Sequence, residues 1–222
     1  MFFFRPQRLA LVVACLCVAM VLNACARTVP ADSLHSPNDP VGINAPAEKL
    51  ALAGVPNAGR ISDVLLRGAQ PAEKGFAELK RSGVTTIVNL RQPGPQVDWE
   101  RKEAESLGLR FLNIPVSGWS APSDAQVAQF LKLFHDPAGP RVFVHCYYGD
   151  DRTGTMVAAY RIAQQHWTAD QAVQEMYSFG FHYYLYPNME SYVRKFPANF
   201  AAGSAFLLLR GVPAQPSEAK RP

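Results

Sequence analysis

The most informative segment of the chain reads Val142-Phe143-Val144-His145-Cys146-Tyr147-Tyr148-Gly149-Asp150-Asp151-Arg152-Thr153-Gly154. Its first three residues are β-branched or aromatic and predict a short buried strand. The largely apolar residues from 153 to 165 predict a helix. A buried strand therefore runs into a tight loop, and the loop runs into a helix.

The spacing within this loop suits a phosphate group. Consecutive backbone amides at a helix N-terminus form a concave array of donors for a phosphate dianion. Gly149 permits a positive φ and a close approach of the backbone to the phosphate oxygens. Arg152 supplies a planar, two-pronged donor at the far end of the loop. Further phosphate contacts are predicted from Tyr147, Tyr148, Asp150, Thr153 and Gly154.

Cys146 is placed to act as a nucleophile. The loop amides, the helix dipole and Arg152 favour its thiolate form. A thiolate that attacks phosphorus divides hydrolysis into two steps through a cysteinyl-phosphate. We expect the Thr153 hydroxyl to hydrogen-bond the sulfur, and His145 to orient the loop from below, because a thiolate needs no general base.

These residues match a known signature at every defined position. His145, Cys146, Gly149, Arg152 and Thr153 resemble the His-Cys-x-x-Gly-x-x-Arg-Ser/Thr motif of the protein tyrosine phosphatase superfamily. The segments 66–71 and 83–91 look like its compact bacterial and plant-fungal dual-specificity-like branch. The resemblance covers roughly residues 58–196, and it implies a three-layer α/β sandwich with a mainly parallel central sheet and a phosphatase that needs no metal or other cofactor.

The general acid that protonates the leaving group has two candidates. Family members often carry this Asp on a separate loop, but residues 113–118 contain no acid. Asp124 lies at the start of a predicted helix, where it could equally serve the helix dipole. Asp151 resembles an acid of a phosphoinositide-active bacterial branch, which has Lys at the position of Asp150. We favour Asp151, with Asp124 as the alternative.

The remaining pattern alternates strands and helices, which is typical of an α/β domain. Strands are expected at 64–66, 84–90, 110–116 and 142–144, and helices at 72–81, 97–107, 122–135, 153–165 and 188–196, with one more opened by the capping box Thr168–Gln171. The predicted phosphatase domain is a single domain over 59–198, followed by a partly disordered extension over 199–222. The segment 67–71 is expected to be a turn. Arg67 and Arg91 follow strands and could face the site, lie on the surface or form ion pairs, and His182 is expected to be structural.

The N-terminus resembles an export signal. Two arginines precede an apolar run over 9–22 that is shorter than the about 20 residues needed to span a bilayer. Leu22-Asn23-Ala24-Cys25 resembles a bacterial lipobox, which implies a signal peptide over 1–24, lipidation at Cys25 and a flexible tether over 25–58. We expect a protein that is lipid-anchored in the bacterial cell envelope and faces the periplasm. Cleavage after residue 26 and secretion is the alternative.

Charge and residue spacing argue against nucleic-acid binding and against a metal site. The formal net charge is +4 and there is no basic run, so nucleic acid is not an expected partner. No His, Asp or Glu cluster has metal-ligand spacing. The expected substrate is a phosphorylated protein, with a phosphoinositide or inositol phosphate as the alternative.

Three other functions remain possible on the same loop. Sulfurtransferase loops usually have one residue fewer between Cys and Arg. The presence of both Cys146 and Arg152 opposes an inactive phosphate-binding module. A redox sensor would need a resolving cysteine, and Cys146 is the only free thiol left if the signal is removed and Cys25 is acylated.

Overall fold

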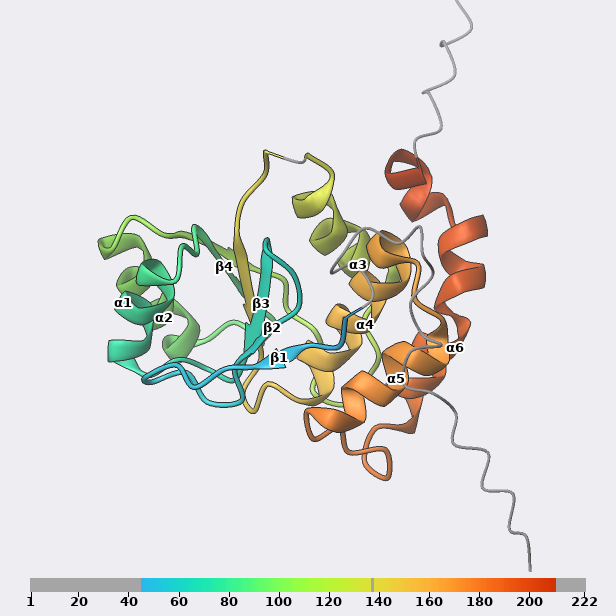
Figure 1. Cartoon of the computed structure of the whole chain (residues 1–222), viewed down its shortest axis with the longest axis horizontal. Helices are drawn as coiled ribbons and strands as arrows, with labels where there is room; N and C mark the ends of the chain where they lie inside the picture. The colour runs from blue at the N-terminus through green and yellow to red at the C-terminus, as the bar shows by residue number, and fades with distance from the viewer. Residues whose placement is uncertain (1–44, 137, 211–222) are drawn as a thin grey trace, which may run out of the picture. The chain divides into compact units, whose positions relative to one another are not determined.

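The computed structural model describes residues 45–136 and 138–210, which build a six-stranded sheet with helices on both faces (Figure 1). The strands are β1 Glu48–Lys49, β2 Gly59–Arg60, β3 Leu65–Gly68, β4 Thr86–Asn89, β5 Arg110–Asn113 and β6 Val142–His145. Their order in the sheet is β1-β2-β3-β6-β4-β5. The pairs β3–β6, β6–β4 and β4–β5 are parallel, whereas β1–β2 and β2–β3 are antiparallel.

Two separate hydrophobic clusters lie on the two faces of this sheet. Alternating side chains of one strand enter opposite clusters, as Leu66 and Leu65 do. The helices α1 Glu73–Arg81 and α2 Pro95–Ser106 cover one face (Figure 1). The other face is covered by α3 Asp124–Leu131, α4 Asp151–Gln165, α5 Ala169–Ser178 and α6 Pro187–Ala202. The predicted three-layer α/β sandwich with a mainly parallel sheet is confirmed.

The helices form where the sequence pattern places them. In α1, Phe76 and Leu79 are fully buried, and Gly83 beyond its end has a φ of +83°. The α5 capping box is present in both directions between Thr168 and Gln171. Helix α4 is buried along most of its length because α5 and α6 pack against it. This central helix begins at the end of the Cys146 loop and holds that loop in place.

Several boundaries differ from the sequence-based expectation. Arg67 and Gly68 belong to β3 and are buried, although a turn was expected there. Residues 48–58, assigned by composition to a tether, include β1 and the buried side chains of Val55 and Ala58. Strands of two residues have too little periodicity to be recognised, and only their pairing with the sheet defines them.

The C-terminal helix is longer than expected. Helix α6 continues through Pro197 to residue 202, and a 3-10 helix (η3, Ser204–Arg210) follows it. Phe206 is fully buried, with its ring centroid 5.5 Å from that of Phe196, so aromatic packing orders this part of the predicted extension. A second 3-10 turn, η2 Lys132–Phe134, ends the predicted 122–135 helix.

The predictions for the signal peptide, for Cys25 and for residues 211–222 lie outside the described residues. Among the helices that the structure describes, none combines the length and the apolarity that crossing a membrane requires.

The register of the parallel strands gathers their carboxyl ends at one edge. His145 lies beside Gly68 on one side and beside Asn89 on the other, and Asn89 lies beside Asn113. The loops that leave these four strands therefore meet, which is where parallel α/β sheets bind ligands.

Candidate active site

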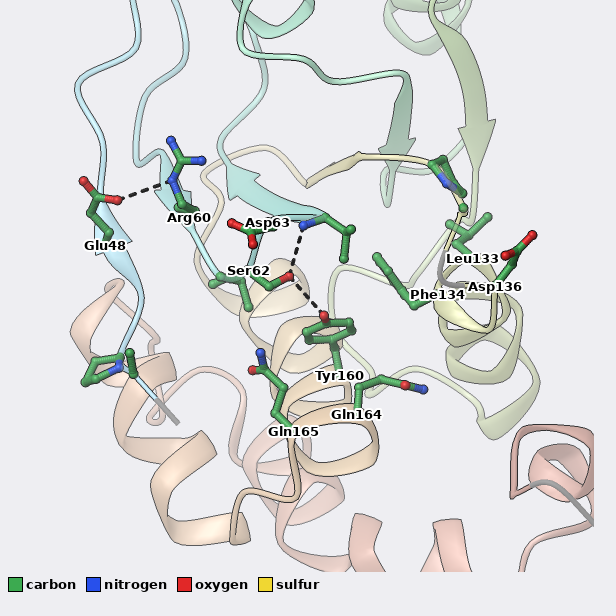
Figure 2. Close-up of a pocket in the computed structure, with 16 residues that line it drawn as sticks. Glu48, Arg60, Ser62, Asp63, Leu133, Phe134, Asp136, Tyr160, Gln164 and Gln165 are labelled. Carbon is green, nitrogen blue, oxygen red and sulfur yellow. Dashed lines mark hydrogen bonds and ion pairs between the residues drawn. The ribbon is translucent and has the colours of Figure 1, made fainter. Parts of the chain in front are cut away.

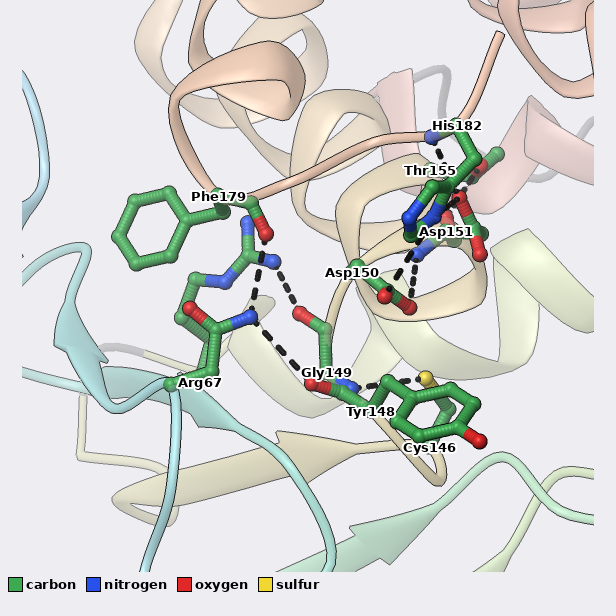
Figure 3. A network of polar contacts seen from close by, with 10 residues as sticks. Arg67, Cys146, Tyr148, Gly149, Asp150, Asp151, Thr155, Phe179 and His182 are labelled. Carbon is green, nitrogen blue, oxygen red and sulfur yellow. Dashed lines mark hydrogen bonds and ion pairs between the residues drawn. The ribbon is translucent and has the colours of Figure 1, made fainter. Parts of the chain in front are cut away.

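The loop between β6 and α4 curls around the Cys146 sulfur. Cys146 is a free cysteine and is almost fully buried, and the Gly149 N–H points to its Sγ at 3.3 Å (Figure 3). Gly149 has a φ of +78°, and a Cβ there would lie 2.5 Å from the Ala69 nitrogen. Both observations require glycine at this position.

The start of α4 is built into the same loop. Asp150 is the N-cap residue, and its Oδ1 accepts a hydrogen bond from the Asp151 N–H at 2.8 Å. Thr153 is fully buried, and within the described residues its hydroxyl has no hydrogen-bond partner. The expected bond from this hydroxyl to the sulfur is not formed in this structure.

Arg152 faces a cavity of about 590 Å³ that we call the catalytic groove. Its lining residues are Arg91, Gln92, Ser117, Gly118, Trp119, Tyr147, Tyr148 and Arg152. Tyr147 and Tyr148 are 50% and 66% exposed, so they form walls rather than core. Two arginines and three aromatic rings thus surround the space above the loop.

A fully buried arginine supports the loop from behind. Arg67 donates a hydrogen bond from Nη2 to the Gly149 carbonyl, and its guanidinium carbon lies 3.9 Å from the centroid of the Phe179 ring (Figure 3). Burial lowers the pKa of Arg67 to about 10, although Glu175, Cys146 and Asp150 oppose that shift. Arg67 therefore stays charged at neutral pH and places a cation beside the loop.

His145 is held by a buried carboxylate. Its Nδ1 lies 2.9 Å from the Cys146 carbonyl, which can only accept, so Nδ1 is a donor. Its Nε2 lies 2.6 Å from Glu100 Oε1, and Asn89 Nδ2 donates to Glu100 Oε2 at 2.7 Å. His145, Glu100 and Asn89 are all fully buried. These contacts link α2 and β4 to the backbone of Cys146 and support the orienting role predicted for His145.

Asp151 and Asp150 share one partner, His182. Asp151 Oδ1 accepts from the His182 N–H at 2.9 Å, and His182 Nδ1 lies 3.4 Å from the same oxygen and 3.6 Å from Asp150 Oδ2. Burial raises the pKa of Asp151; Asp150 adds to this shift, while hydrogen bonding from His182 opposes it. The ligand-type atoms of the three residues lie within 4.8 Å of one another, a grouping that sequence spacing did not indicate.

Asp124 is engaged elsewhere. Its Oδ1 accepts a hydrogen bond from the Tyr192 hydroxyl at 2.9 Å. Burial raises the pKa of Tyr192, and this hydrogen bond adds to the shift. Neither Asp124 nor Asp151 is among the residues that line the catalytic groove. Asp151 lies in the first turn of α4 beside Arg152, whereas the carboxylate of Asp124 is bonded to a residue of α6.

A family model described as "DSP-PTPase phosphatase fused to NAD+ Kinase" matches residues 57–186, more than half of the chain. The chain belongs to this phosphatase family. Dual specificity protein phosphatase TpbA of Pseudomonas aeruginosa is 33% identical over 127 residues, which are 56% of this chain and 55% of that protein. Human phosphatidylglycerophosphatase and protein-tyrosine phosphatase 1 is 27% identical over 151 residues, 64% of this chain and 74% of that protein.

Solved structures agree with the family. The crystal structure of P. aeruginosa TpbA superposes with a TM-score of 0.58 at 28% identity, over 71% of this chain and 98% of that chain. The catalytic core of the S. cerevisiae phosphatase SIW14, at 18% identity and a TM-score of 0.55, shares the fold. The chain spans about half the length of the curated TpbA sequences that it matches.

A second cavity of this phosphatase domain lies away from the loop (Figure 2). It also measures about 590 Å³, and it opens where β3 and β6 begin, beside Ser62, Asp63 and Tyr160. Ser62 and Tyr160 share a 3.0 Å hydrogen bond there. Because the strands' amino ends are opposite the phosphate loop, this cavity is separate from the active site.

The sequence predicts the Cys146 loop of this phosphatase but not all of the residues that contact it. Glu100 looked like one of several charges on a helix, and only its burial distinguishes it. For Arg67 the sequence predicts a residue that faces the site, lies on the surface or forms an ion pair, whereas the structure buries it behind the loop and bonds it to the Gly149 carbonyl. His182 was expected to be structural, and it contacts both loop acids.

Proposed function

We propose that this protein is a metal-independent, cysteine-dependent phosphatase that hydrolyses phosphomonoesters on tyrosine and other residues of proteins. One observation carries the proposal: Cys146 is buried beneath a glycine turn whose N–H points at its sulfur, at the N-terminus of a buried helix. A thiolate in that position is both stabilised and aimed at a phosphorus atom bound above it.

In the first chemical step, the Cys146 thiolate attacks phosphorus and the P–O bond to the leaving alcohol breaks. Arg152 and the loop amides bind the phosphoryl oxygens and stabilise their negative charge. Asp151 donates a proton to the leaving oxygen. In the second step, Asp151 accepts a proton from water, which attacks phosphorus, breaks the S–P bond and releases phosphate and the thiolate.

The surroundings of Asp151 support its role as the acid. Burial and the neighbouring Asp150 both favour its protonated form, which is the form needed in the first step. The engagement of Asp124 with Tyr192 argues against the alternative.

A phosphoinositide or another phospholipid is the second candidate substrate. It is favoured by the human relative, whose name includes phosphatidylglycerophosphatase as well as protein-tyrosine phosphatase. The Asp150–Asp151 pair beside the loop opposes a headgroup with several phosphates, because like charges repel. We therefore keep a phosphorylated protein as the first candidate.

The N-terminal residues support a further proposal on location. A signal peptide over 1–24 and lipidation at Cys25 would anchor the domain to the bacterial envelope and face it toward the periplasm, with secretion as the alternative. Mass spectrometry of the mature N-terminal peptide tests this: a diacylglyceryl group on Cys25 that disappears in Cys25→Ser is expected, whereas an unmodified N-terminus would contradict it.

The decisive experiment is hydrolysis of p-nitrophenyl phosphate by the purified protein with a chelator present. We expect activity that is insensitive to the chelator and lost in Cys146→Ser. A phosphorylated protein trapped by rapid acid quench, absent in Cys146→Ser, would establish the cysteinyl-phosphate. Full activity in Cys146→Ser, or activity restored only by a divalent metal, would overturn the proposal.

A further inference from the structure

Arg91 lines the catalytic groove together with residues of the phosphate loop and takes no part in the steps above. It follows β4 by two residues, and the intervening Leu90 N–H donates to the His145 carbonyl at 2.9 Å. The backbone segment just before Arg91 is therefore hydrogen-bonded to His145, the residue that precedes Cys146. Its guanidinium carbon lies 5.0 Å from the centroid of the Tyr147 ring, one residue beyond Cys146.

The backbone of Arg91 is held by two asparagine side chains, of which Asn89 is fully buried. Its N–H donates to Asn89 Oδ1 at 2.7 Å, and its carbonyl accepts from Asn113 Nδ2 at 2.9 Å. Asn89 is in turn bonded to Glu100, the carboxylate that supports His145. One buried network thus positions both the nucleophile and Arg91, which is how a binding residue is preorganised.

The side chain of Arg91 is oriented by a hydrogen bond, but within the described part of the chain its positive charge is not balanced by an ion pair. Its Nη1 donates to Gln70 Oε1, a neutral acceptor. Among the described residues, no carboxylate lies within ion-pair distance of it. An unneutralised, half-buried guanidinium with free donors is a site for an anion.

Arg91 lines two neighbouring cavities whose walls are built from similar residues. The catalytic groove and a neighbouring cavity of about 540 Å³ share Arg91, Tyr147 and Tyr148. Within the described residues, neither has an aspartate or a glutamate in its lining. Aromatic walls suit an aryl ring, and Arg91 adds a second positive charge beyond the one that Arg152 gives to the phosphate.

We propose that Arg91 forms a second anion subsite, which selects phosphotyrosyl peptides with an acidic residue beside the phosphotyrosine. The phosphate binds the Cys146 loop, the tyrosine ring lies against Tyr147 and Tyr148, and the neighbouring carboxylate pairs with the Arg91 guanidinium. This inference rests on the proposed phosphatase function and adds a substrate class to it.

The test compares two phosphotyrosyl peptides that differ only by Glu or Gln beside the phosphotyrosine, with p-nitrophenyl phosphate as a substrate that has no second anion. We expect the wild-type protein to favour the Glu peptide by about tenfold in kcat/KM. Arg91→Gln should abolish that preference through KM, lowering kcat/KM for the Glu peptide more than for p-nitrophenyl phosphate, and Arg91→Lys should restore it in part.

Arg110→Gln is the matched control, because it removes the same charge from an exposed residue at the amino end of β5. It should keep the preference for the Glu peptide. Equal kcat/KM values for the two peptides in the wild-type protein would overturn the inference, as would an equal loss on p-nitrophenyl phosphate in Arg91→Gln. A preference confined to inositol bisphosphates over monophosphates would assign the subsite to a different substrate. Absence of all activity would instead contradict the proposed phosphatase function.

Discussion

The Arg67 guanidinium donates a hydrogen bond to the Gly149 carbonyl from a position with no solvent exposure. The same residue directs its N–H to the Cys146 sulfur, so this bond restrains one side of the glycine whose other side contacts the sulfur. A buried charge on β3 therefore fixes the geometry of a loop that lies 82 positions further along the chain.

Replacing Arg67 should weaken phosphate binding. Arg67→Met keeps much of the buried volume but removes the charge and the donor, so we expect the inhibition constant of inorganic phosphate to rise about tenfold. Arg67→Lys retains the charge without the planar fork and should give an intermediate value. The measurement is competitive inhibition of p-nitrophenyl phosphate hydrolysis at neutral pH. An unchanged inhibition constant in a folded Arg67→Met protein would contradict this role.

Glu100→Gln tests the support of His145. An amide cannot match the charge of the carboxylate that contacts the ring and Asn89, and this contact is wholly buried. We expect a loss of about 2 kcal/mol in the free energy of unfolding, measured in urea, and about a tenfold fall in kcat. Glu105→Gln, an exposed change on the same helix, is the control and should alter neither quantity. Similar behaviour of the two variants would refute the positioning role of Glu100.

Gly149→Ala should inactivate the protein. Its positive φ of +78° disfavours any side chain, and the added methyl group would clash with the backbone of residues 68 and 69. We expect kcat/KM to fall at least about a hundredfold, because the loop amides must move away from the phosphate. Gly94→Ala is the control, since φ there is 163° and a Cβ would meet no atom within 4 Å. Full activity of Gly149→Ala would mean that the loop tolerates a different backbone.

Asp151→Asn should lower activity and change the pH dependence of stability. The pKa of Asp151 is raised in the folded state, so the folded protein binds more protons than the unfolded chain, and this residue's contribution to stability falls as pH rises. Asp151→Asn removes the cost of ionising a buried carboxylate at higher pH, and the amide oxygen of the variant can still accept a hydrogen bond from the His182 N–H. We expect its Tm relative to wild type to increase from about pH 4 toward pH 7.

Activity separates the two acid candidates. With an alkyl phosphate, whose leaving group needs a proton, Asp151→Asn should lower kcat about a hundredfold. Asp124→Asn should stay within about threefold of wild type, because its carboxylate is bonded to Tyr192 of α6 and it does not belong to the loop that carries Cys146 and Arg152. The reverse order of these two losses would assign the acid to Asp124.

The amino-acid sequence by itself determined the parts of this protein that depend on neighbouring residues. The β-branched and aromatic run at 142–144, the glycine turn, and the spacing from Cys146 to Arg152 predict a strand, a phosphate loop and a helix from local sequence alone. The same holds for α1, with Phe76 and Leu79 on one face, and for the α5 capping box. Local conformational preference and periodicity suffice for such features.

Only the tertiary structure decided which distant side chains meet. Arg67 reaches Gly149 because β3 pairs with β6, and Glu100 reaches His145 because α2 packs on that face of the sheet. Asp124 is bonded to Tyr192 because α3 and α6 lie on the other face. Such contacts depend on strand register and helix packing, which sum many weak interactions over the whole domain, so no short stretch of sequence contains them.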